Sequence, residues 1–252
     1  MIAGYELHVL LIIGAAFLVA GGIKGVIGVG TPLVVVPVGA LLLPPTIVLS
    51  FLIVPIIAAN AYQYFSSDLR RDCIRRFWPA AAAQLIATTI TTQFLVRIDP
   101  DNLKLMLGVA ISFFALLQVV RFDVEIAPRH ERFLQVGTGA MAGGIGGVTG
   151  FQGPLLMVML FTLKVGKDMF VTAMAMFFLV SYLPMFATLS AASILGLPEL
   201  LISAAATVPL VLGIKFGERF RKRVSQELFR KLIAAMLVII GCNLIWVALS
   251  AS

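Results

Sequence analysis

Two stretches of the sequence repeat a glycine-rich phrase whose residue types suit the binding of an anion. The first phrase, GGIKGVIGVGTPL, starts at Gly21, and the second, GGIGGVTGFQGPL, starts at Gly143, with eight identical residues in thirteen positions. Glycine adopts positive φ angles and lets backbone N–H groups approach a ligand closely, and proline fits the first turn of a following helix. Because a helix start presents free N–H groups and the positive end of the helix dipole, each phrase predicts an anion site.

Polar side chains within the two phrases are candidate ligands of that anion. Thr31, Thr149 and Gln152 can donate hydrogen bonds to an oxyanion, although hydroxyls in membrane helices often bond the preceding turn instead. An ionisable residue such as Lys24 is costly at membrane depth and usually functional there, but a lysine near a helix end can also extend to the interface. The predicted substrate-binding residues of the phrases are Lys24, Gly28, Gly30, Thr31, Thr149, Gly150, Gln152 and Gly153.

Two other groups of polar residues stand within apolar segments. Asn60 and Gln63 lie late in the third apolar segment, where they either line the substrate cavity or cap its cytoplasmic end, and we include both among the candidate binding residues. Gln84, Thr88 and Thr92 recur at intervals of four residues and therefore share one helix face. This stripe indicates contact with water or with another helix, and hydrogen bonding between helices is the favoured interpretation.

The elements that carry these residues are predicted to be membrane-spanning helices. Of the 252 residues, 60% are hydrophobic and 12% are charged, which excludes a soluble globular protein. A bilayer core about 30 Å thick requires about 20 apolar residues per helix. We predict an all-α integral membrane protein with apolar segments at residues 8–22, 32–43, 46–65, 77–96 and 103–120, and again at 133–147, 154–163, 169–190, 197–214 and 232–249.

These segments form two related halves, residues 1–126 and 127–252, which we predict to be inverted repeats. The loop SSDLRRDCIRRF after the third segment is basic, whereas its counterpart LSAASILGLPEL has no basic residue, and the next pair of loops reverses this bias. By the positive-inside rule, matching loops face opposite sides of the inner (plasma) membrane and both termini lie outside. Inverted repeats are typical of secondary transporters.

The segment that follows each glycine phrase is too short to cross a bilayer. At ten to twelve residues it spans roughly 15 to 18 Å, about half of the hydrocarbon core, so we expect a broken or re-entrant helix at each phrase. Broken backbone at membrane depth is tolerated only where it is buried in protein or lines a wet cavity. Close packing of helices through small residues would explain a single phrase, but two copies in antiparallel halves favour a binding site.

Other functional classes lack their sequence motifs. The sequence contains no Gly-x-Ser-x-Gly or His-Glu-x-x-His motif, and Cys73 and Cys242 form no metal-ligand cluster. The net charge of +7 comes from short loops, where membrane topology explains it better than a nucleic-acid partner does. We therefore expect no enzyme activity, cofactor, metal or nucleic acid. The expected partners are a small anionic substrate, the lipid bilayer and a coupling ion, H⁺ or Na⁺, with the oligomeric state left open.

The two phrases resemble those of the sulfite exporter TauE/SafE family, also called the toluene sulfonate uptake permease family. The resemblance covers essentially the whole chain and rests on a G-x-x-G-x-G-x-P type of phrase near the start of each half. The first phrase has Gly25, Gly28, Gly30 and Pro32. The second has Gly147, Gly150 and Pro154, with Gln152 in place of the third glycine. It implies secondary transport of small organic or inorganic anions, commonly sulfur oxyanions such as sulfite or sulfonates. The alternatives are a passive anion channel and, less favoured, an intramembrane enzyme.

Overall fold

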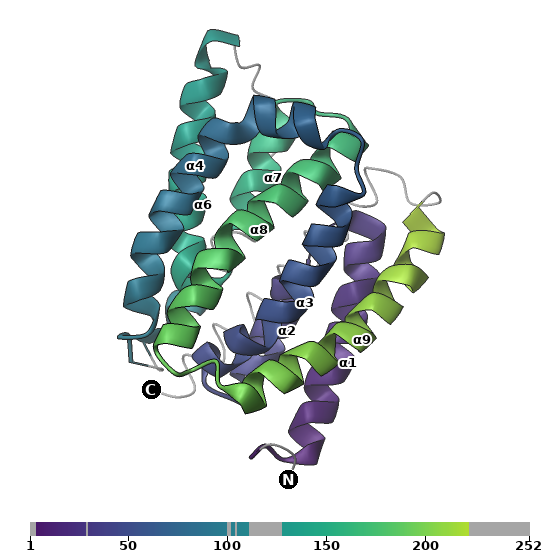
Figure 1. Ribbon diagram of the computed structural model, residues 1–252, viewed down its shortest axis with the longest axis vertical. Coiled ribbons are helices and arrows are strands. Elements are labelled where there is room, and N and C mark those ends of the chain that lie inside the picture. The colour runs from purple at the N-terminus through teal and green to yellow at the C-terminus, as the bar shows by residue number, and fades with distance from the viewer. Residues whose placement is uncertain (1–3, 29, 100–101, 104, 111–127, 222–252) are drawn as a thin grey trace.

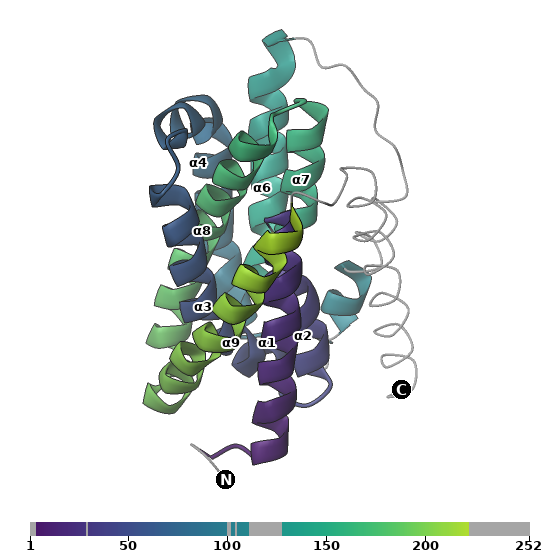
Figure 2. The ribbon, with the colours of Figure 1, turned by 90° about the vertical axis from the view of Figure 1, so that its right-hand side faces the viewer.

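The structure is an assembly of helices. The computed structural model describes residues 4–28, 30–99, 102–103, 105–110 and 128–221, and within them every regular element is helical, as predicted (Figure 1, Figure 2). The first half contains α1 (Leu7–Ile27), α2 (Thr31–Ala40), α3 (Pro45–Phe65) and α4 (Arg70–Leu95). The second half contains a short 3-10 turn, η1 (Pro128–His130), and then α6 (Glu131–Thr149), α7 (Gly153–Thr162), α8 (Lys167–Ala191) and α9 (Leu197–Arg221).

Several of these helices are suited to a membrane. In the described part of the chain, four are long and apolar enough to cross one, and their spans are Leu7–Val26, Pro45–Phe65, Lys167–Ala191 and Leu197–Arg219. The apolar helices α2 and α7 have ten residues each, or about 15 Å of helix, which is half of a bilayer core. The prediction that short segments follow the glycine phrases is therefore confirmed.

Some predicted boundaries are wrong in an informative way. The predicted end of the first segment at Gly22 lies five residues too early, because α1 continues to Ile27. The basic loop predicted before residue 77 is helical from Arg70, and α9 continues past residue 214 to Arg221. Arginine and lysine are good helix formers, so charged residues extend a helix beyond the apolar run. The predicted segment at 103–120 is described only in part, and the segment at 232–249 lies outside the described residues.

Helices from the two halves pack in pairs. In Figure 1, α1 lies along α9 and α4 lies along α6, while α3 and α8 lie between these pairs. Glycines make both contacts close, since a Cβ atom at any of four positions would collide with a carbonyl oxygen of the partner helix: Gly21 with Leu210, Gly25 with Ile214, Gly139 with Ala80 and Gly143 with Gln84. The early glycines of each phrase therefore serve helix packing, as the alternative interpretation held.

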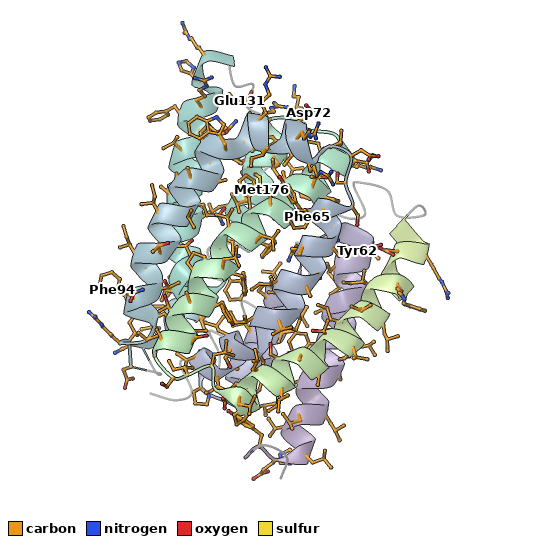
Figure 3. All side chains as sticks on the ribbon, viewed as in Figure 1. Tyr62, Phe65, Asp72, Phe94, Glu131 and Met176 are labelled. Atoms are coloured by element: carbon orange, nitrogen blue, oxygen red, sulfur yellow. The ribbon has the colours of Figure 1, made fainter. Side chains whose placement is uncertain are left out.

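The charged side chains gather at the helix ends. Figure 3 shows Asp72 and Glu131 near one end of the molecule and Phe94 toward the other. Exposed basic residues at the start of α4, namely Arg70, Arg71, Arg75 and Arg76, flank Asp72 in sequence, and Arg76 forms an ion pair with Glu131. The centre is apolar and is built mainly from α3 and α8, with Phe51, Leu52, Phe177 and Tyr182 fully buried. Polar atoms within this centre therefore require a specific explanation.

Candidate functional site

The first helix break lies between the end of α1 at Ile27 and the start of α2 at Thr31. The N–H of Gly28 donates to Lys24 O at 2.6 Å and closes the end of α1 in the left-handed conformation that glycine favours, with a φ of 88°. Gly30, with a φ of 127°, then precedes Thr31, where α2 begins, and Pro32 lies in its first turn. Since no side chain caps the start of α2, its first N–H groups face the break.

The second break, between α6 and α7, repeats the closing glycine of the first break, but the residue before the short helix differs, since Gln152 has a φ of −74° where Gly30 has a φ of 127°. The N–H of Gly150 donates to Gly146 O at 2.7 Å, with a φ of 75°. Helix α7 then begins at Gly153, with Pro154 in its first turn and no side-chain cap. Each phrase thus contains the end of one helix and the start of a short helix, and the interruption occupies only the end of the phrase.

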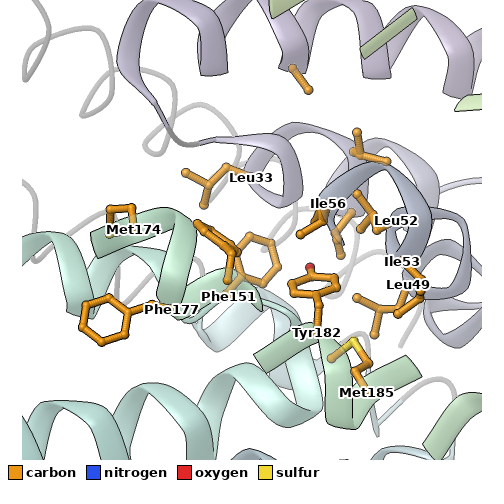
Figure 4. Packing of buried hydrophobic residues seen from close by; sticks show 14 of the residues in the cluster. Leu33, Leu49, Leu52, Ile53, Ile56, Phe151, Met174, Phe177, Tyr182 and Met185 are labelled. Atoms are coloured by element: carbon orange, nitrogen blue, oxygen red, sulfur yellow. The ribbon is translucent and has the colours of Figure 1, made fainter. Parts of the chain in front are cut away.

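The two breaks meet at a small cavity. Gly30, Pro32 and Leu33 line it from the first break, and the remaining lining residues, from the second break and from helices α7 and α8, are Gly150, Phe151, Gly153, Pro154, Met157 and Phe178. Its volume, about 10 Å³, is close to the least that holds one water molecule. Figure 4 shows Leu33 and Phe151 approaching each other across this region. The helix starts after both glycine phrases therefore converge on one place, in a closed arrangement.

Lys24 is buried beside this cavity. It is 3% exposed, so its side chain does not reach solvent at the end of α1. Nζ donates to Asn60 Oδ1 at 2.9 Å and to Gly28 O at 3.3 Å, and it lies 5.7 Å from the centre of the Phe178 ring, which lines the cavity. An ammonium group has three donors, so one remains for a ligand. No Asp or Glu within the described residues pairs with this lysine, so the protonated amine would have no fixed counter-charge.

Other predicted site residues differ in how their polar atoms are used. Thr31 Oγ1 and both amide atoms of Gln152 are buried with no hydrogen-bond partner among the described residues, as is Gln63 Oε1. Thr149 Oγ1, by contrast, donates to Ile145 O at 2.8 Å and accepts from the N–H of Phe151 at 3.2 Å. Thr31 and Gln152 are therefore available to a ligand, while the Thr149 hydroxyl holds the second break together.

Asn60 and Gln63 come from α3, one helical turn apart. Asn60 Nδ2 donates to Ile56 O at 2.7 Å, which fixes the amide so that Oδ1 accepts from Lys24. Asn60 is fully buried and Gln63 is partly exposed. Asn60 therefore positions the lysine, whereas no contact of Gln63 with the breaks is seen in the described residues, and its role stays a prediction.

Tyr182 is a candidate that the motif analysis missed. It is fully buried on α8 with an unpaired hydroxyl, and a Cβ atom at Gly150 would lie 3.3 Å from that oxygen. Figure 4 shows the hydroxyl directed into the cluster that contains Phe151 and Ile56. A tyrosine within an otherwise apolar segment was the available sequence signal, because buried tyrosine hydroxyls usually find a partner.

The polar stripe on α4 joins helices rather than forming part of the breaks. Gln84 Nε2 donates to Ser181 Oγ at 2.7 Å, and the hydroxyls of Thr92 and Thr188 lie 3.2 Å apart, so the stripe contacts α8. The interpretation as hydrogen bonding between helices is confirmed. Among the described residues, no group of three His, Cys, Asp or Glu side chains could hold a metal ion.

The apolar helices and the buried polar breaks define a multi-pass membrane protein. The family model of the sulfite exporter TauE/SafE matches residues 13–244, and the chain belongs to this family of transporters. Searches among curated proteins and among solved structures found no match. The family assigned from the glycine phrases is therefore confirmed over most of the chain.

Proposed function

We propose that this protein is a secondary transporter of small anions, most specifically of sulfur oxyanions such as sulfite or a sulfonate. The observation that carries this proposal is the meeting of two uncapped helix starts beside a buried lysine that has no carboxylate partner in the described residues. An anion there supplies the missing counter-charge and accepts hydrogen bonds from Thr31, Gln152 and Lys24. The family name supports sulfite as the first substrate to test.

These donors are sufficient for useful affinity without a salt bridge inside the protein. A partly buried helix start contributes about 0.3 to 2 kcal/mol toward an anion, and a hydrogen bond to a charged group contributes about 1.5 to 3 kcal/mol. Two helix starts and three side-chain donors, less the cost of immobilising the ion, correspond to affinities of roughly micromolar to millimolar strength. This range suits a transporter, which must release its substrate.

We propose transport by alternating access, which the small size of the cavity supports. A sulfite ion has four non-hydrogen atoms, and a space of about 10 Å³ accepts little more than one water. In the proposed mechanism the two breaks separate to admit the substrate. We propose that the two halves, residues 1–126 and 127–252, are inverted repeats that move against each other, which the matching breaks and the exchange of packing partners between halves support.

Membrane orientation is part of the proposal. We infer an inner-membrane protein with both termini outside, because the basic ends of α4 and α9 fit the cytoplasmic side. Native Cys73 is buried and therefore unsuited to labelling. Introduced cysteines at exposed Arg71 and Ser193 suit the test: an impermeant maleimide added to intact cells should label Ser193→Cys but not Arg71→Cys. Labelling in the opposite sense would overturn the orientation.

Transport assays separate the proposed carrier from a channel and from an enzyme. Purified protein in proteoliposomes should take up labelled sulfite, and unlabelled sulfite inside the vesicles should accelerate that uptake. A channel gives no such trans-stimulation, and an enzyme yields a chemically changed product. The coupling ion, H⁺ or Na⁺, is identified in the same assay by imposing each gradient separately. Uptake driven by neither gradient would leave the gradient of the substrate itself as the driving force.

A further inference from the structure

A second cavity lies between the ends of α4 and α6, away from the glycine breaks. Its volume is about 250 Å³, and the lining residues are Arg75, Arg76, Trp78, Pro79, Glu131, Arg132 and Gln135. None of them belongs to a glycine phrase or to the proposed anion site. Figure 3 shows Glu131 at this end of the molecule. The cavity therefore requires an explanation of its own.

The cavity is positively charged. Glu131 is fully engaged, since Arg76 Nε and Nη2 donate to its two oxygens at 2.8 and 3.3 Å and Gln135 Nε2 donates to Oε1 at 3.0 Å. Arg75 and Arg132 have no carboxylate partner among the described residues. Three guanidinium groups against one carboxylate leave two positive charges around the space. Guanidinium groups suit phosphate oxygens especially well.

Gln135 adds a second indication of a ligand. Its side chain is 1% exposed, and Oε1 has no hydrogen-bond donor among the described residues. An unpaired buried acceptor is uncommon in a folded protein. A ligand that combines a phosphate with a hydroxyl group would satisfy both the arginines and this acceptor.

The surroundings of the cavity place it at a membrane surface. Trp78 lines the cavity and is 57% exposed, and Phe133, beside Arg132 in sequence, is 83% exposed. Aromatic residues of this kind gather at the level of lipid headgroups. Below Trp78, exposed apolar side chains follow α4 at intervals of four residues, at Ile86, Ile90 and Phe94. Such a face suits the acyl chains of a lipid whose headgroup occupies the cavity.

We propose that this cavity binds the phosphate of an anionic phospholipid whose headgroup carries free hydroxyl groups, with phosphatidylglycerol as the probe. Arg75 and Arg132 hold the phosphate, the Arg76–Glu131 pair forms the wall, and Gln135 accepts from a headgroup hydroxyl. Basic pockets between membrane helices bind acidic headgroups in this manner. The proposal is independent of the transported substrate, because it uses other residues and another ligand.

Quenching of Trp78 fluorescence by brominated lipid tests the proposal. The sequence has two tryptophans, so the full-length Trp246→Phe protein reports on Trp78 alone. In phosphatidylcholine vesicles, brominated phosphatidylglycerol should quench Trp78 fluorescence at a mole fraction at least roughly tenfold lower than brominated phosphatidylcholine does. One or two charge-assisted hydrogen bonds to the headgroup account for a preference of this size. Equal quenching by the two lipids would overturn the proposal.

Matched variants show which arginines are responsible. Arg75→Gln with Arg132→Gln should abolish the preference for phosphatidylglycerol, whereas Arg71→Gln with Arg219→Gln removes the same charge from exposed positions outside the cavity and should preserve it. A preference that survives the first pair, or is lost equally in both pairs, would contradict a specific site. The single Arg132→Gln variant serves the same comparison if the double variant does not fold.

Soluble phosphates distinguish a lipid from a free ligand. Inorganic phosphate and glycerol 3-phosphate, added at millimolar concentration, should not relieve quenching by brominated phosphatidylglycerol. Relief by either compound would assign the cavity to a soluble phosphate instead and overturn the lipid proposal.

Discussion

The break between α1 and α2 and the break between α6 and α7 share a closing glycine and a following proline, but they differ in the conformation of the residue before the short helix and in their side chains. Both close a helix with a glycine in the left-handed conformation and start a short helix with proline in its first turn. The first glycine phrase carries Lys24 and Gly30, and the matching positions of the second phrase carry Gly146 and Gln152. Each glycine phrase thus provides one helix start. The first phrase adds the charge of Lys24, and the second adds the neutral amide of Gln152.

This difference teaches how a repeated motif becomes an asymmetric site. Only glycine fits at position 146, because Gln152 packs against it and a Cβ atom there would lie 2.7 Å from Gln152 Oε1. A lysine at position 146 would displace the amide. The charge of Lys24 instead depends on Asn60, a residue of α3. We therefore expect the shared backbone to be required for all activity and the individual side chains to tune affinity.

The largest effect is expected from the glycines with positive φ. Gly28→Leu and Gly150→Leu should each abolish sulfite transport, because a Cβ atom would lie 2.9 Å from Val171 Cγ2 or from Leu49 Cδ2 and the φ angle would be strained. Uptake into proteoliposomes measures the effect. Gly144→Leu, in the same phrase but with no atom within 4 Å of its Cβ position, is the matched control and should remain active.

If both Leu variants transport at the rate of the unmodified protein while expressing normally, the breaks are not part of a site. Loss of activity in the Gly144 control as well would mean that any glycine substitution damages the fold. Size-exclusion chromatography of each purified variant distinguishes a folded protein with a damaged site from a protein with a damaged fold.

Removal of the lysine charge is expected to be the next largest effect. Lys24→Gln should weaken sulfite binding by roughly ten- to a hundredfold, since it removes a charge-assisted hydrogen bond and the buried positive charge. Lys215→Gln, at an exposed position on α9, is the control and should bind normally. Unchanged sulfite affinity in the Lys24 variant would limit this residue to a structural bond with Asn60.

The neutral donors should have smaller, graded effects. Gln152→Leu should weaken binding by roughly tenfold, as one hydrogen bond to a charged group is lost, and Thr31→Val should weaken it by somewhat less. Thr149→Val should mainly lower thermal stability, because its hydroxyl bonds Ile145 O and the Phe151 N–H. Anion titrations and melting curves of the same samples distinguish these outcomes. If the Thr149→Val variant binds sulfite more weakly but keeps its thermal stability, the Thr149 hydroxyl contacts the anion directly.

Local chemistry explains which features could be predicted from the sequence. Proline and glycine act on their own backbone, so the starts of α2 and α7 lie within one residue of the predicted positions 32 and 154. Gly21 and Gly22 did not end α1, because Gly21 packs against the backbone of α9, and no local rule reveals a distant partner. The same reason hid the contact between Lys24 and Asn60, which are 36 residues apart.

Isolated polar residues that belong to no motif were the other features that could not be predicted from the sequence. Tyr182 and Gln135 stand alone in apolar or amphipathic helices, and only the folded chain shows that the Tyr182 hydroxyl and Gln135 Oε1 are buried without partners among the described residues. The cavity formed by Arg75 and Arg132 likewise combines two helices that are distant in sequence. In the sequence, the basic loop that contains Arg75 indicated only the membrane topology.

The most direct test of the central claim is the equilibrium binding of sulfite to the purified protein, measured with the unmodified chain, Lys24→Gln, Gln152→Leu and the double variant. We predict micromolar to millimolar affinity for the unmodified chain, a loss in each single variant, and non-additive losses in the double variant, because residues that share one ligand are coupled. Sulfite binding that neither substitution changes, or binding of a neutral or cationic solute with no response to any oxyanion, would contradict an anion site formed jointly by the two breaks.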